Sequence, residues 1–139
     1  MEPAPVRADR TCLILADRHQ ALLEGLQGLL RSRFDAVVTV SDEESLREAV
    51  RRMAPALVVL DLGLAADGLG ALRRLRELRG DQRVVLLSLH DAAAAVEAAW
   101  RAGADGFVVK ASIAEDLLPA ADAVLGGRRF ASAAAGGGR

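Results

Sequence analysis

The chain has 139 residues, about the length of one domain and enough to bury a single core. It is 52% hydrophobic and 27% charged, an ordinary balance for a globular protein, and its formal net charge of −1 lacks the basic surplus that a nucleic-acid-binding face needs. No apolar run approaches the roughly 18 residues that cross a bilayer, and the first residues do not match a signal peptide. We therefore expect a cytoplasmic protein with no membrane association.

Two residue types are used unusually sparingly. Cys12 is the only cysteine, which excludes an internal disulfide and a cysteine-based metal cluster. Its apolar surroundings predict a buried, inert thiol. Lys110 is the only lysine among 18 basic residues, and all the others are arginines. A solitary lysine suggests a role that a compact ammonium group fills better than a guanidinium group.

Short apolar strands and amphipathic helices are predicted to alternate along the chain. The strands are expected at residues 11–17, 35–40, 57–61, 83–88 and 105–110. The helices are expected at 22–34, 46–53 and 69–78, over an alanine-rich segment that ends at Gly103, and from Ser112 to Gly126 and Gly127. The predicted helix-end signals are capping boxes at Ser41 with Glu44 and at Ser112 with Glu115, a cap at Asp91, and closure of the third helix by Gly80.

This alternation, with a spacing of about 24 residues, predicts an α/β protein with a flavodoxin-like (βα)5 doubly wound parallel sheet. The expected strand order is 2-1-3-4-5, which places the first and third strands at the switch point where such sheets bind ligands. We expect an N-terminal tail at 1–10, one domain at 11–127, and a C-terminal tail or linker start at 128–139.

Four of the five predicted strands end on side chains that can do chemistry, namely Asp17, Asp61, Ser88 and Lys110. Each alone has a plainer reading as a helix cap, a turn residue or a solvated charge. Together they indicate phosphoryl transfer to a carboxylate. Asp61 would be the nucleophile, Lys110 and the Ser88 hydroxyl would meet the phosphoryl oxygens, and Asp17 would help to hold Mg²⁺.

This pattern resembles the receiver domain of bacterial two-component response regulators over about residues 11–132, through the motifs LILADRH, VVLDLGLAADG, VVLLSLHD and GADGFVVK. The stretches ADRHQALLEGL and VLGGRRFAS are most similar to receivers that precede a LuxR-type helix-turn-helix domain. The resemblance implies that Asp61 accepts phosphate from a histidine kinase or a small phosphodonor, and that Ser88 and Lys110 read its state. It also implies that Phe107 is a switch aromatic that turns inward on activation. DNA contact is expected only through a further C-terminal domain, and enzymatic activity only as autocatalytic transfer to Asp61.

The sequence departs from that family at Arg18, which stands where receivers carry a second acid that contacts Mg²⁺. We therefore expect weak or absent metal binding at Asp17 and Asp61. Two arrangements of Arg18 are open: it folds inward and bridges the two aspartates in place of the ion, or it points to solvent. Two functions also remain open, a phosphoacceptor with weakened metal dependence and a phosphorylation-independent interaction or dimerisation module.

The remaining aromatic and histidine residues each have two interpretations. Trp100, late in the fourth helix, is either partly buried in the core or an interface anchor for a homodimer or another partner. Phe107 has no hydroxyl group, so burial alone would drive its switch, and plain core packing is the alternative. His19 and His90 are expected to be solvated loop residues rather than metal or catalytic groups.

Two other protein classes are disfavoured. Phosphatases of the haloacid-dehalogenase type carry a second acid two residues after the nucleophile, whereas Gly63 follows Asp61 and His19 follows Asp17 at that spacing. A flavin-binding module of similar topology needs a phosphate-cradling loop after the first strand, and residues 18–21 do not form one.

Overall fold

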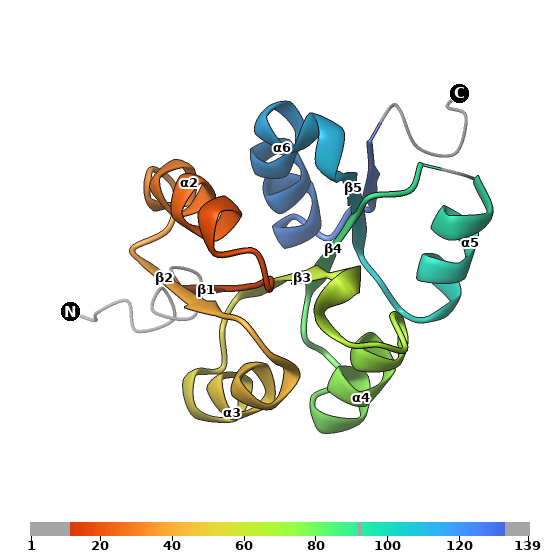
Figure 1. Cartoon of the computed structure of the whole chain (residues 1–139), viewed down its shortest axis with the longest axis horizontal. Coiled ribbons are helices and arrows are strands. Elements are labelled where there is room, and N and C mark those ends of the chain that lie inside the picture. Colours follow the sequence, from red (N-terminus) through yellow and green to blue (C-terminus); the bar gives the residue numbers. More distant parts are fainter. Residues whose placement is uncertain (1–11, 92, 133–139) are drawn as a thin grey trace.

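The computed structural model describes residues 12–91 and 93–132 (Figure 1). These residues contain a parallel sheet in the order β2-β1-β3-β4-β5-β6. The first five strands confirm the predicted flavodoxin-like order. The strands are β1 (Cys12–Ala16), β2 (Ala36–Val40), β3 (Leu57–Asp61), β4 (Val84–Ser88), β5 (Gly106–Val109) and β6 (Phe130–Ala131).

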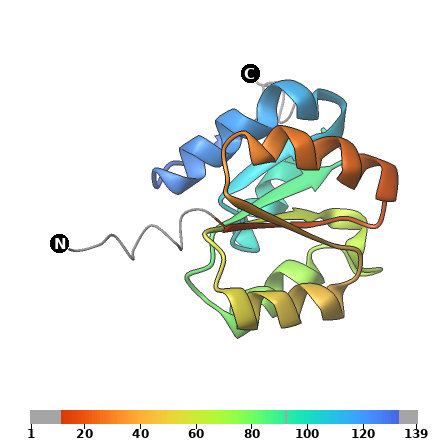
Figure 2. The ribbon, with the colours of Figure 1, turned by 90° about the vertical axis from the view of Figure 1, so that its left-hand side faces the viewer.

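Helices cover both faces of this sheet, as Figures 1 and 2 show. One face packs against α2 (Gln20–Arg31) and α6 (Ile113–Leu125). The other packs against α3 (Glu43–Met53), α4 (Gly70–Leu78) and α5 (Ala93–Arg101). Two 3₁₀ turns, η1 (Leu62–Leu64) and η2 (Lys110–Ser112), follow β3 and β5 directly. None of the helices in the described ranges combines the length and apolar character that a membrane crossing requires.

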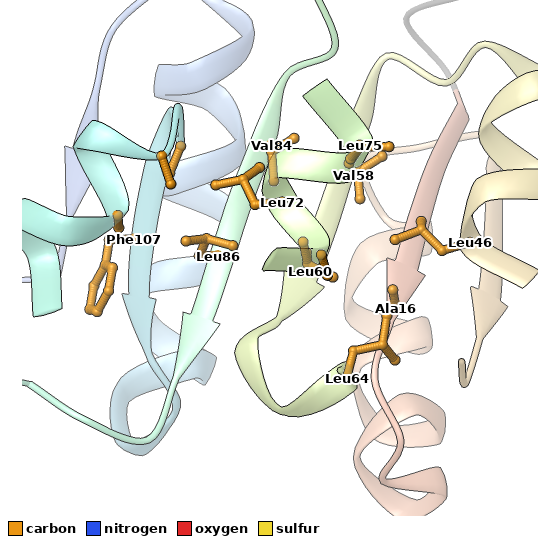
Figure 3. Close-up of a cluster of buried hydrophobic side chains, with 14 of the residues drawn as sticks. Ala16, Leu46, Val58, Leu60, Leu64, Leu72, Leu75, Val84, Leu86 and Phe107 are labelled. Carbon is orange, nitrogen blue, oxygen red and sulfur yellow. The ribbon is translucent and has the colours of Figure 1, made fainter. Parts of the chain in front are cut away.

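The central strands are apolar on both faces because both faces are covered. Every residue of β3 and of β4 is buried. Within β3, Val58 and Leu60 join the core under α3, α4 and α5 (Figure 3), whereas Leu57 and Val59 join the core under α2 and α6. A fully buried side chain of this size contributes about 1.5–3 kcal/mol, so these two cores hold the strand ends in fixed positions.

Both predicted capping boxes are wrong in detail. Helix α3 is capped by Asp42 rather than Ser41, and the Asp42 carboxylate accepts a hydrogen bond from the Ser45 amide at 2.7 Å. That hydrogen bond lowers the pKa of Asp42, and the negative charge suits the positive end of the helix dipole. Ser112 does precede α6, but its hydroxyl donates to the Val109 carbonyl and the Asp116 carboxylate instead of accepting from the first turn.

The glycine signals at helix ends are confirmed in two places. Gly103 has a φ of 99° after α5, and Gly127 has a φ of 84° after α6, backbone conformations that favour glycine. Helix α4 ends at Leu78, as predicted, with Arg79 as its cap, but the following Gly80 does not adopt the positive φ of a glycine cap. Helix α5 begins at Ala93, directly after residue 92, which lies outside the described residues. The cap predicted at Asp91 therefore stays a prediction.

Strand β6 lies in a segment for which the sequence predicted no strand. It pairs Phe130 with Gly106 and Ala131 with Phe107. The Ser132 amide donates to the Phe107 carbonyl at 2.9 Å, and the Ser132 hydroxyl accepts from the buried Val109 amide at 3.0 Å. These bonds satisfy part of the outer edge of β5. At the other side of the sheet, Cys12 is only partly buried, and burial raises the pKa of its thiol, in keeping with an inert group.

Candidate functional site

The candidate site lies where four neighbouring parallel strands end. Asp17 follows β1, Asp61 ends β3, Ser88 ends β4 and Lys110 follows β5. All except Lys110 are almost completely buried, and Lys110 keeps 10% of its side chain exposed. The contacts of Lys110 bring it together with Asp17 and Asp61, and Ser88 lines one pocket with Asp61 and Lys110.

The ammonium group of Lys110 bridges the two carboxylates. Its Nζ atom lies 2.9 Å from Oδ2 of Asp17 and 2.8 Å from Oδ1 of Asp61. Burial by itself lowers the pKa of Lys110, but the hydrogen bonds and charges of Asp61 and Asp17 outweigh it, and the net effect raises this pKa above its usual 10.5. Two carboxylates against one ammonium leave the buried cluster with a net charge of −1 when all three are ionised.

One oxygen of this cluster has no partner. Oδ2 of Asp61 is buried and accepts no hydrogen bond from any described residue. Oδ2 of Asp17 likewise lacks a well-aligned hydrogen bond, but the Lys110 ammonium 2.9 Å away compensates its charge. An uncompensated buried carboxylate oxygen is costly in free energy, so Asp61 Oδ2 is the atom best placed to react or to bind a cation.

Arg18 does not bridge the two aspartates, so the first of its two proposed arrangements is wrong. It is exposed, and its Nη1 atom donates to the Gly63 carbonyl oxygen at 3.3 Å. Among the described residues it forms no ion pair, because Lys110 already fills the bridging position. Arg18 therefore places a positive charge at the rim of the site and engages a carbonyl oxygen that would otherwise be free to bind a cation.

His19 contacts the site, which the sequence interpretation missed. Its Nδ1 atom lies 2.8 Å from Oδ1 of Asp17, and its amide donates to the same oxygen at 2.9 Å, although 65% of its side chain is exposed. The available signal was the spacing, because an aspartate side chain commonly accepts a hydrogen bond from the backbone two residues later. That turn brings the imidazole ring back over Asp17.

A pocket of about 380 Å³ opens above Asp61. Ser88 lines it with its side chain turned toward the following loop: its hydroxyl accepts from the His90 amide at 2.9 Å and lies 3.1 Å from the His90 carbonyl. His90 is an exposed loop residue, as predicted. The neighbouring Leu89 is 75% exposed and gives the pocket an apolar lip.

The two aromatic residues singled out by the sequence lie on adjacent elements. Phe107 is fully buried and points into the core under α3, α4 and α5 (Figure 3). Trp100 is partly buried against the same core, and the guanidinium carbon of Arg129 lies 4.7 Å from its ring centroid. Both observations agree with core packing, and the switch role of Phe107 and the interface role of Trp100 stay predictions.

The donor set at the carboxyl end of the sheet fits a divalent cation in part. Asp17, His19 and Asp61 each offer one ligand atom, and these atoms lie within 4.8 Å of one another. The free, buried Oδ2 of Asp61 supports such a role. Against it, only two carboxylates are present and the Gly63 carbonyl is engaged by Arg18. Since Mg²⁺ prefers oxygen ligands, the residues fit it weakly.

Comparison with known proteins places the chain among signalling proteins. The profile of the response regulator receiver domain family matches residues 13–122. The chain is 28% identical over 128 residues to the transcriptional regulatory protein DegU of Brevibacillus brevis, covering 90% of this chain and 54% of the relative. It is 32% identical over 125 residues to the nitrate/nitrite response regulator protein NarL of Escherichia coli K12, covering 88% and 58%. The chain thus spans a little over half the length of these relatives.

Solved structures agree with this family. A two-component response regulator of the LuxR family from Aurantimonas superposes with a TM-score of 0.80 at 31% identity, over 87% of this chain and 89% of that one. The apo form of the isolated REC domain of RcsB from Salmonella enterica serovar Typhimurium superposes with a TM-score of 0.81 at 21% identity, over 90% of this chain and 95% of that one. The second likeness supports the fold alone.

Proposed function

The chain belongs to the response regulator receiver domain family, of the LuxR/NarL type, and on this premise we propose that Asp61 is its phosphoacceptor. The observation that carries this proposal is the buried, unpartnered Oδ2 of Asp61 beside an ammonium group that already holds Oδ1. Asp61 lines an open pocket, and a carboxylate oxygen that no other group holds can act as the nucleophile toward a phosphodonor that enters this pocket.

In the proposed step, Oδ2 of Asp61 attacks the phosphorus of a phosphohistidine or a small acyl phosphate. A new P–O bond forms, the bond to the donor breaks, and the donor group leaves with that electron pair. Lys110 meets the charge on one phosphoryl oxygen, and the Ser88 hydroxyl donates to another. To do so, Ser88 gives up its present contact with His90, so phosphorylation would rearrange the 88–91 loop.

Mg²⁺ bound to such a site would neutralise charge that develops on the phosphoryl oxygens. Asp17 and Asp61 would hold the ion, and Arg18 weakens their affinity by its charge and by engaging the Gly63 carbonyl. We therefore propose slow phosphorylation with a shallow Mg²⁺ dependence. The signal would pass by a conformational change or by homodimerisation near Trp100. DNA contact would need a further C-terminal domain, as the greater length of the relatives suggests.

A second candidate function has an observation in its favour. The charge of Lys110 already holds the two buried carboxylates without an added ion. A receiver whose cluster is stable in this form can act as a phosphorylation-independent interaction module. In that case partner binding or dimerisation would be the same for the wild type and for Asp61→Asn.

Intact-mass measurement after incubation with acetyl phosphate, with and without Mg²⁺, tests the first function. We expect a phosphoryl adduct that Asp61→Asn abolishes and that Mg²⁺ promotes only weakly. Arg18→Asp restores the missing acid and should raise both the rate and its Mg²⁺ dependence. If neither the wild type nor Arg18→Asp formed a phosphoryl adduct, the result would instead favour the interaction module.

A further inference from the structure

We propose that His19, Asp17 and Asp61 form a binding site for a borderline divalent transition-metal ion, such as Zn²⁺ or Co²⁺, in preference to Mg²⁺. This inference deepens the metal site of the proposed function and rests on it only for the location of that site. It does not require that Asp61 be phosphorylated.

The ligand atoms lie close together, and those of His19 and Asp17 already have a suitable separation. One nitrogen of His19 and one oxygen from each of Asp17 and Asp61 lie within 4.8 Å of one another. Nδ1 of His19 is 2.8 Å from Oδ1 of Asp17. Two ligands at about 2.1 Å from one metal ion, in adjacent coordination positions, are roughly 3 Å apart. An ion placed between Nδ1 and this carboxylate oxygen would therefore bind both atoms with little movement of either side chain.

An independent observation points to a ligand at this place. The side chain of Asp61 is only 4% exposed, and its Oδ2 atom has no partner among the described residues. Lys110 takes the other oxygen of Asp61, so it does not satisfy Oδ2. The net charge of the buried cluster formed by Asp17, Asp61 and Lys110 is −1. A divalent cation would therefore enter a site whose net charge is negative.

The chemistry of the donor set decides which ion fits. Asp17 and Asp61 are the only carboxylates in this candidate ligand set, and Arg18 engages the nearby Gly63 carbonyl. His19 supplies an imidazole nitrogen in compensation. Imidazole suits Zn²⁺, Co²⁺ and Ni²⁺, whereas Mg²⁺ demands oxygen ligands in near-ideal octahedral geometry. The exposed position of His19 leaves its other nitrogen in contact with water and gives an ion a route into the pocket.

The composition of the chain makes this inference easy to test. The sequence contains two histidines and one cysteine. Cys12 lies at the opposite end of β1 from Asp17, outside the site. His90 lines the same pocket as His19, so it is a matched control for non-specific histidine coordination.

The experiment is isothermal titration of the full chain with ZnCl₂, CoCl₂ and MgCl₂, without any phosphodonor. Because a site built from carboxylates alone also favours Zn²⁺ somewhat, the variants decide the question. We expect His19→Ala to weaken Zn²⁺ and Co²⁺ binding at least tenfold while changing Mg²⁺ binding less than twofold. His19→Gln, which keeps a side-chain donor toward Asp17 but is a poor metal ligand, should behave like His19→Ala. His90→Ala should match the wild type, and Zn²⁺ should shift the His19 ring resonances in NMR spectra.

Unchanged Zn²⁺ affinity in His19→Ala, equal losses in His19→Ala and His90→Ala, or Mg²⁺ binding tighter than Zn²⁺ would each overturn the proposal. Its failure is separable from that of the proposed function. Adduct formation on Asp61 is measured by mass in His19→Ala and in the wild type, so phosphorylation without histidine-dependent metal binding would overturn only the present inference.

Discussion

The two ends of the sheet both carry buried or half-buried polar groups, but these groups are satisfied to different degrees. At the amino end, Arg76 of α4 donates to the Gly103 and Gln82 carbonyl oxygens and to the Asp105 carboxylate, which also accepts from the Val84 amide. At the carboxyl end, Lys110 holds Asp17 and Asp61, yet one oxygen of Asp61 stays free.

This difference separates a structural network from the network that we propose to be reactive. The Arg76 network ties α4 to the starts of β4 and β5, and each of its charged groups has partners. Gln82 at that end does leave its Oε1 atom unpartnered, but an uncharged amide oxygen is cheaper to bury alone than a carboxylate oxygen. Under the proposed function, a phosphoryl group or a cation bound at Asp61 Oδ2 would recover the free energy that is lost by leaving this atom unpaired.

Replacing Lys110 should lower the free energy of unfolding more than any of the other substitutions described below. Lys110→Met leaves two buried carboxylates facing each other, and we expect it to lower the free energy of unfolding by about 3 kcal/mol near pH 7. Urea unfolding at several pH values measures the loss.

The size of this loss should depend on the pH through the Lys110 ammonium group of the wild type. Its raised Lys110 pKa means that this group's stabilising effect is fully present below the usual 10.5 and is lost as the pH rises through the higher folded-state value. A Lys110→Met loss that does not shrink as the pH rises above 10.5 would contradict the charge-based account.

Replacing Arg76 should have the second largest effect. Arg76→Leu deprives the Gly103 and Gln82 carbonyl oxygens and Asp105 of a donor, and we expect it to lower the free energy of unfolding by about 2 kcal/mol. Its phosphoryl adduct yield should match that of the wild type. Arg73→Leu, an exposed arginine on the same helix, is the control and should stay within about 0.5 kcal/mol. If Arg76→Leu and Arg73→Leu lost the same free energy of unfolding, the Arg76 hydrogen bonds would not account for the effect.

Much of the fold was predictable from the sequence because several signals agreed. Runs such as 57–60 and 84–87 are apolar at every position, which is typical of strands covered on both faces. The convergence of Asp61 and Lys110 then follows from strand order, since neighbouring parallel strands end at the same edge.

The errors concern choices that depend on a few tenths of an ångström or on distant partners. Ser41 and Asp42 are both good caps, and only the observed backbone path selects Asp42. The position of Arg18 depends on Lys110 having taken the bridging site, which no local pattern reveals. Strand β6 is too short to carry a periodic signal, and it forms because β5 offers an open edge.

The edge contact of β6 sharpens the comparison, because Ser132 pairs with Phe107 and Val109 near the carboxyl end of β5. Ser132→Ala removes the acceptor of the buried Val109 amide, and we expect it to lower the free energy of unfolding by about 1 kcal/mol. The adduct yield on Asp61 should not change. Ser41→Ala, at an exposed position, serves as the control. If Ser132→Ala abolished phosphorylation, the unpaired oxygen of Asp61 would not be sufficient to explain where the chain is phosphorylated.

Asp61→Asn should have the smallest effect on stability and the largest on function. The amide keeps an oxygen for Lys110 and removes one of the two buried negative charges, while Asp17 still balances the ammonium group. We therefore expect the free energy of unfolding to stay within about 1 kcal/mol of the wild type or to rise, whereas the phosphoryl adduct disappears. Urea unfolding and intact-mass measurement on the same samples check both halves. A loss of 3 kcal/mol, as expected for Lys110→Met, would mean that Asp61 is held in place for stability, and the contrast between the two ends of the sheet would vanish.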